Sequence, residues 1–236
     1  MNVCSLPLRQ APPRAPELPA FPQQSPIAIE DAVYADFGDR KLELNWAERL
    51  KGKVQADDHG HGTTLTLTSQ SEPHEIRLDR QKFQLESFHF HAPSEHWLGG
   101  KAHDMELHLV HRNPESGHLA VMGILVDGDA PREQQPDPLC KFLRDVHEAG
   151  ESGAEIEFKP SMFLPEYPSH YYRYEGSLTT PPYSSNVSWV VMAEPLHVSQ
   201  DELAELKDLF EKPARPPQPL HRRFVLASFP QGQVAG

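Results

Sequence analysis

Short runs of alternating apolar and polar residues recur along this chain, and this pattern most limits the folds that it can adopt. Alternation with a period of two is typical of strands that bury one face. Turns rich in Gly, Asp, Asn and Pro separate the runs, which lie at residues 41–46, 63–68, 86–91, 104–110, 119–126, 155–158 and 186–192. The sequence therefore predicts a mainly β (α+β) single domain built on one large sheet.

Two segments have the longer apolar period of a helix. Residues 137–150 are expected to form one helix that stops at Gly150. Residues 199–212 are expected to form another, because Ser199 and Glu202 have the spacing of a capping box. The predicted apolar faces consist of Leu139, Phe142, Leu143 and Val146 in the first helix and of Leu203, Leu206 and Phe210 in the second.

Charge and the termini limit the partners of the chain. The net charge of −12 over 236 residues disfavours nucleic acid, which requires a basic surface, and no apolar run is long enough for a membrane span.

We expect a proline-rich, disordered segment at residues 1–23, a folded domain at 24–230 and a flexible tail at 231–236. No signal peptide is visible, so a cytoplasmic protein is expected for the chain as given; a truncated start would instead allow a periplasmic or secreted protein. Cys4 and Cys140 are too few for a disulfide framework, and free thiols are expected, with a single Cys4–Cys140 bridge as the alternative.

Histidines are concentrated on two of the predicted strands. His89 and His91 share one strand face, and Phe88 and Phe90 the other. His108 lies on a second predicted strand, where it shares a face with Glu106 and Val110. If these strands are neighbours, three imidazoles converge in a set that suits zinc with one open position. Glu106 then lies near enough to hydrogen-bond a ligand histidine, either His108 or a neighbour. The chain has 14 histidines, however, and most histidines bind no metal, so spacing alone leaves both readings open.

Longer blocks of sequence resemble one known family. FHFHAPSEH (88–96), MELHLVH (105–111) and YEGSLTTPPYSSNVSWVVM (174–192) are similar to the alpha-class carbonic anhydrases, in the bacterial type. QSPIAI (24–29), LAVMGIL (119–125) and ARPPQPLHRR (214–223) agree with the same family and occur in its order. The resemblance implies a central, largely antiparallel twisted β-sheet with a few peripheral helices.

The resemblance also implies an activity: the reversible hydration of carbon dioxide to bicarbonate and a proton. Zinc-bound hydroxide would attack carbon dioxide, aromatic sulfonamides would inhibit, and one Zn²⁺ would bind per chain. A homodimer has precedent in the family. The implied zinc ligands are His89, His91 and His108, and the residues implied to support them by hydrogen bonds are Glu106, His96 and Tyr174. The implied catalytic residues are Thr179, Glu95 and the proton shuttle His61, with His59 as its competitor. The implied substrate pocket consists of Val110, Val121, Leu178, Thr180, Val187 and Trp189.

Two positions depart from the family pattern. Ser87 stands where a glutamine often supports the first zinc histidine, and Tyr183 stands where secreted bacterial members often have a cysteine. Two other interpretations remain at this point: a non-catalytic binding module of the same fold, and a metal-storage or metal-sensing protein that uses the surplus histidines. The presence of all three ligand histidines favours the enzyme.

Overall fold

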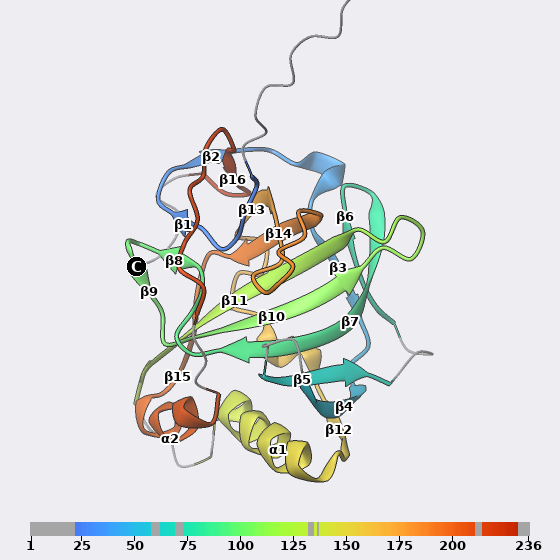
Figure 1. Ribbon diagram of the computed structural model, residues 1–236, viewed down its shortest axis with the longest axis vertical. Coiled ribbons are helices and arrows are strands. Elements are labelled where there is room, and N and C mark those ends of the chain that lie inside the picture. Colours follow the sequence, from blue (N-terminus) through green and yellow to red (C-terminus); the bar gives the residue numbers. More distant parts are fainter. Residues whose placement is uncertain are drawn as a thin grey trace, which may run out of the picture.

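The computed structural model describes residues 22–57, 62–68, 73–131, 135, 137–210 and 214–230. Its centre is a 13-stranded sheet with the main order β12-β4-β5-β7-β10-β11-β14-β13-β16-β2 (Figure 1). Most neighbours in this sheet are antiparallel, and the pairs β11–β14, β11–β15 and β16–β2 are parallel. The fold prediction is thus confirmed, with a mixed sheet in which antiparallel pairing predominates.

Most strands have six residues or fewer, and the four longest have 8 to 12. The strands are β1 (Ala28–Ile29), β2 (Ala32–Tyr34), β3 (Glu43–Trp46), β4 (Leu50–Asp57), β5 (Gly62–Leu67), β6 (His74–Leu78), β7 (Gln81–His91), β8 (Trp97–Leu98), β9 (Lys101–Ala102), β10 (Met105–Arg112), β11 (Leu119–Ala130), β12 (Glu155–Phe158), β13 (Tyr171–Gly176), β14 (Val187–Met192), β15 (Leu196–Ser199) and β16 (Val225–Ala227). The helices are α1 (Pro138–Ser152) and α2 (Gln200–Phe210), with 3₁₀ turns η1 (Gly38–Arg40) and η2 (Pro160–Phe163). Every run predicted as a strand from its alternation overlaps a strand, and the bounds differ by one or two residues where a run extends beyond its strand.

The two predicted helices form, but their ends differ from the prediction. Gly150 does not stop the first helix: α1 continues to Ser152, and Gly153 ends it in the left-handed conformation with φ 65°. A glycine terminates a helix only where the chain must turn left-handed, and at Gly150 it does not. The predicted capping box is also not formed within the described residues. Glu202 instead accepts hydrogen bonds from the backbone N–H of Asp137 and the guanidinium of Arg144, which joins the two helices.

The central sheet separates the main apolar core from the face that carries the histidines. Phe88 lies fully buried on the core face of β7, with its ring 5.8 Å from Phe142 of α1 and 5.3 Å from Phe163 of η2 (ring centroids). Figure 1 shows α1 and α2 together below the sheet. Because side chains alternate along a strand, burying Phe88 and Phe90 in this core directs His89 and His91 to the opposite face.

Two further expectations can be compared with the described residues. Cys140 of α1 is buried and forms no disulfide among the described residues, and Cys4 lies outside them. Neither α1 nor α2 has the length and apolarity of a membrane-crossing helix.

Candidate metal and catalytic site

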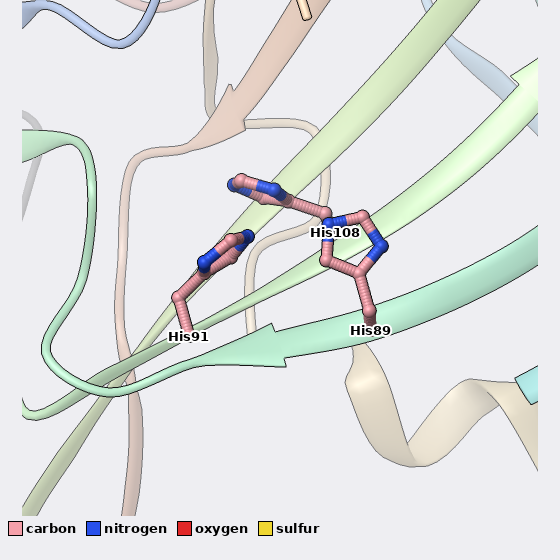
Figure 2. Close-up of side chains that lie close together, drawn as sticks. All are labelled: His89, His91 and His108. Atoms are coloured by element: carbon pink, nitrogen blue, oxygen red, sulfur yellow. The ribbon is translucent and has the colours of Figure 1, made fainter. Parts of the chain in front are cut away.

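Three buried histidines converge on one face of the sheet. β7 and β10 are antiparallel neighbours, and His108 is the register partner of His89. Figure 2 shows the rings of His89 and His91 from β7 and of His108 from β10 directed toward one another. One nitrogen from each ring lies within 4.8 Å of the others, so the set could hold a metal ion. β7 and β10 are therefore the neighbouring strands that convergence of the three histidines required.

The carboxylate of Glu106 is fully buried and accepts four hydrogen bonds. Its Oε1 accepts from His108 Nε2 at 2.9 Å and from His96 Nδ1 at 2.7 Å. Its Oε2 accepts from the backbone N–H groups of Glu95 and His96 at 2.9 and 2.8 Å. Since His108 uses Nε2 for this bond, its Nδ1 is the nitrogen left for a metal, as in metal sites where a carboxylate accepts the other ring N–H of a ligand histidine. Spacing left the partner of Glu106 undecided, and the structure gives it two.

Electrostatics keep this carboxylate ionised. Burial alone would raise the pKa of Glu106, but the charges and hydrogen bonds of His96 and His108 outweigh burial and hold the pKa well below its usual range. Glu106, His96 and His108 also bring potential metal-ligating atoms within 4.8 Å of one another. The two short distances to Glu106 are the hydrogen bonds just described, so we assign this second group to support of the histidine set.

His96 connects this support to Tyr174. Its Nε2 lies 2.6 Å from the Tyr174 hydroxyl, which donates to Ser25 Oγ at 2.9 Å. Burial holds the pKa of Tyr174 well above its usual value, so the phenol stays protonated. The structure thus brings Tyr174 and His96 into one buried chain of hydrogen bonds that ends at Glu106.

Glu95 and Thr179 meet beside the histidines although they are distant in sequence. The Thr179 side chain hydrogen-bonds the Glu95 carboxylate, and Glu95 Oε1 also accepts from the backbone N–H of Arg215 at 3.0 Å. Glu95 Oε2 lies 3.6 Å from His91 Nε2. Burial raises the pKa of Glu95, while His108, Thr179 and Arg215 oppose that rise.

An apolar cluster adjoins the histidines. Val110 of β10 pairs with Val121 of β11, which in turn pairs with Trp189 of β14, so three adjacent strands present these side chains side by side. The Trp189 ring centroid lies 4.9 Å from that of His108. The cluster also includes Val187 and Leu178. Thr180, also expected in the substrate pocket, is buried next to Thr179.

Two expected site residues lie outside the described residues, and a third position of interest, Ser87, lies within them. His61 and His59 are both outside them, so the shuttle stays a prediction. Ser87 precedes His89 by two residues on the same strand and pairs with Val110 of β10 and Thr66 of β5. It therefore lies on the histidine face.

Sequence reasoning missed two residues that shape the site. Gly123 of β11 is the register partner of His108, and a Cβ there would lie 2.7 Å from Glu106 Oε1. The glycine thus leaves room for the buried carboxylate; an isolated glycine within an apolar strand is the signal that could have revealed it. Arg215 was also missed as a partner of Glu95, and no local pattern marks a backbone N–H contact between residues so far apart.

Comparison with known proteins agrees with this geometry. A family model described as eukaryotic-type carbonic anhydrase matches residues 15–229. The chain belongs to the carbonic anhydrase family. A carbonic anhydrase of Nostoc sp. PCC 7120 is 40% identical over 170 residues, which cover 70% of this chain and 61% of that relative.

Solved structures of carbonic anhydrases have the same fold. The alpha-carbonic anhydrase of Photobacterium profundum superposes with a TM-score of 0.71 at 33% identity, covering 86% of this chain and 88% of that one. The alpha-carbonic anhydrase of Thermovibrio ammonificans, solved in complex with the inhibitor sulfanilamide, gives a TM-score of 0.71 at 32% identity, covering 86% of each chain. The family resemblance read from the sequence blocks is confirmed.

Proposed function

We propose that this carbonic anhydrase hydrates carbon dioxide reversibly to bicarbonate and a proton, using one zinc ion held by His89, His91 and His108. The observation that carries the proposal is the convergence of three buried imidazoles, one of them oriented by a buried carboxylate. Three neutral nitrogen ligands with an open fourth position are the donor set of catalytic zinc. Zinc held in this way makes hydroxide available near neutral pH, an effect for which carbonic anhydrase is itself the standard example.

Thr179 and Glu95 would orient the reacting oxygen. A carboxylate at Glu95 can only accept, so the Thr179 hydroxyl donates its proton to it. The Thr179 oxygen then acts as an acceptor toward the histidine face. A single acceptor at that point fixes one orientation of the attacking group, and this orientation would speed the reaction.

The apolar cluster would hold carbon dioxide beside the histidines. Val121, Val187 and Trp189 are buried. The valine side chains have no hydrogen-bonding group, and the one such group of Trp189, its indole N–H, already donates to Ser177 O. Carbon dioxide would therefore be held loosely and close to its reaction partner. The proton released would leave through a mobile histidine with a pKa near neutral, for which His61 remains the prediction and His59 the competitor.

The test is stopped-flow hydration of carbon dioxide by the zinc-loaded chain, with and without an aromatic sulfonamide. We expect fast hydration that the sulfonamide abolishes, with one zinc ion bound per chain. His108→Ala should remove both activity and zinc, whereas His118→Ala, at an exposed histidine, should change neither. Binding of one zinc ion without hydration would favour a non-catalytic binding module, and binding of several zinc ions would favour metal storage.

A further inference from the structure

The loop between β13 and β14, residues 177–186, carries Thr179 and includes a strained residue. Tyr183 has a φ of 59°, a left-handed conformation that residues with a Cβ seldom adopt. Within the loop, Leu178 N–H donates to Ser184 O at 3.0 Å and Tyr183 N–H donates to Thr180 O at 2.9 Å. Such a conformation persists only where the surroundings hold it, so contacts from outside the loop are needed.

Arg215 supplies those contacts together with the segment at Gln24 and Ser25. Its guanidinium lies 3.9 Å from the centroid of the Tyr183 ring. Its Nη2 donates to Gln24 Oε1 at 2.9 Å and its Nη1 to Ser25 O at 2.6 Å. Gln24 Nε2 donates in turn to Tyr183 O at 3.2 Å. These four residues form a closed ring of contacts, which we call the Arg215 clamp.

The segment at Ser25 is itself attached to the start of the same loop. The Ser25 N–H donates to Ser177 Oγ at 3.0 Å, and the Ser177 N–H donates to Ser25 Oγ at 3.1 Å. The clamp therefore holds the loop on both sides of Thr179: at Ser177 through Ser25, and at Tyr183 directly and through Gln24.

The backbone of Arg215 reaches the other end of the Thr179–Glu95 hydrogen bond. The Arg215 N–H donates to Glu95 Oε1 at 3.0 Å. Arg215 thus contacts Glu95, the acceptor of this bond, through its backbone. Its side chain contacts the loop that carries Thr179, the donor. Fixing the guanidinium in the clamp also fixes the N–H that holds Glu95.

We propose that Arg215 is a positioning residue for the reaction, in which the Arg215 clamp sets the geometry of the Thr179–Glu95 hydrogen bond. The planar guanidinium is suited to this role because it reaches two acceptors at once while its face lies on an aromatic ring, and a lysine cannot do both. The catalytic consequence rests on the proposed hydration of carbon dioxide, and the structural consequence does not.

The test compares Arg215→Met and Arg215→Lys with Arg49→Met, which removes an exposed ion pair to Glu157. We expect Arg215→Met to lower kcat/KM for hydration roughly ten-fold, mostly in kcat, with one zinc ion still bound. Arg215→Lys should recover little of this loss, and Arg49→Met should be silent. Tyr183→Leu tests the same clamp should Arg215→Met not fold, with Tyr183→Phe as its matched control because the ring remains.

A double-mutant cycle separates positioning from general stability. If Arg215 acts through the Thr179 bond, Arg215→Met should change kcat/KM by less than about two-fold in a Thr179→Val background. A ten-fold loss that persists in that background would overturn the proposal, and so would an Arg215→Met variant as active as the parent.

Hydrogen exchange of the peptide covering residues 177–185 gives a readout that needs neither activity nor zinc. Arg215→Met should speed this exchange, and Arg49→Met should not. If the parent chain hydrates no carbon dioxide, the proposed function fails by itself. The exchange result then decides the clamp: faster exchange supports it and unchanged exchange overturns it.

Discussion

His111 should make the stability of this carbonic anhydrase sensitive to mild acid. The side chain is fully buried on the core side of β10 and stacks on Trp46, with ring centroids 6.1 Å apart. Its Nδ1–H donates to Leu109 O at 3.0 Å. Burial is the main cause that lowers the pKa of His111 to about 3, with a smaller contribution from the charge of His74, and the folded protein keeps the ring neutral.

The sign and size of the effect follow from the difference between the folded and unfolded states. An unfolded chain protonates His111 below the ordinary pKa of 6.5, and the folded chain does so only near pH 3. Between these values the unfolded state binds more protons, so stability falls as the pH falls. The loss is about 1.4 kcal/mol per pH unit, which amounts to about 2 kcal/mol by pH 5.

The perturbation is to replace His111 with side chains that do not titrate. His111→Asn keeps a donor for Leu109 O, and His111→Phe keeps a ring against Trp46. Both should be less stable than the parent at pH 7.5 through lost packing or a lost hydrogen bond. The difference in unfolding free energy between parent and variant should then shrink by about 2 kcal/mol at pH 5, because only the parent loses the His111 contribution.

Urea unfolding at several pH values between 7.5 and 5, with a chelator in every sample, measures this difference. The chelator keeps metal off His89, His91 and His108, so that their protonation is common to all variants. His118→Asn, at an exposed position, serves as the control and should show a difference that does not depend on pH. If the parent–variant difference for both His111 variants stays constant from pH 7.5 to 5, the folded protein protonates His111 readily and the argument from burial is refuted.

Three other perturbations test the support of the site and the core. Gly123→Ala should push on Glu106 and weaken zinc binding roughly 10- to 100-fold in a chelator competition, and unchanged affinity would show that the carboxylate can move without loss. Glu202→Ala should lower the unfolding free energy by about 1–3 kcal/mol because it disconnects α1 from α2, whereas the exposed Glu148→Ala should stay within about 0.5 kcal/mol; equal effects in denaturant titrations would contradict this. Phe88→Ala should cost about 3–5 kcal/mol in the same assay by opening a cavity among the aromatic rings, and a cost below about 1 kcal/mol would mean that the core collapses around it.

Local periodicity made much of the fold predictable. The alternation in residues 86–91 assigns Phe88 and Phe90 to one face and His89 and His91 to the other, and the structure agrees because this alternation is a property of any extended chain. The helices were also predictable from a local period, that of one apolar face on a helix. The helix ends were harder to predict, since the stop at Gly153 and the turn of Glu202 toward Asp137 depend on how α1 and α2 pack together.

By itself, the sequence determined the strand faces, the three histidines that could hold a metal ion and, through its blocks, membership of the carbonic anhydrase family. Only the tertiary structure decided that His108 lies opposite His89, that Gly123 leaves space for Glu106, and that the backbone of Arg215 holds Glu95. The physical reason is the separation along the chain between the residues that interact. A side chain's face follows from its immediate neighbours along the chain, whereas a contact between residues 120 positions apart is set by the packing of the whole sheet.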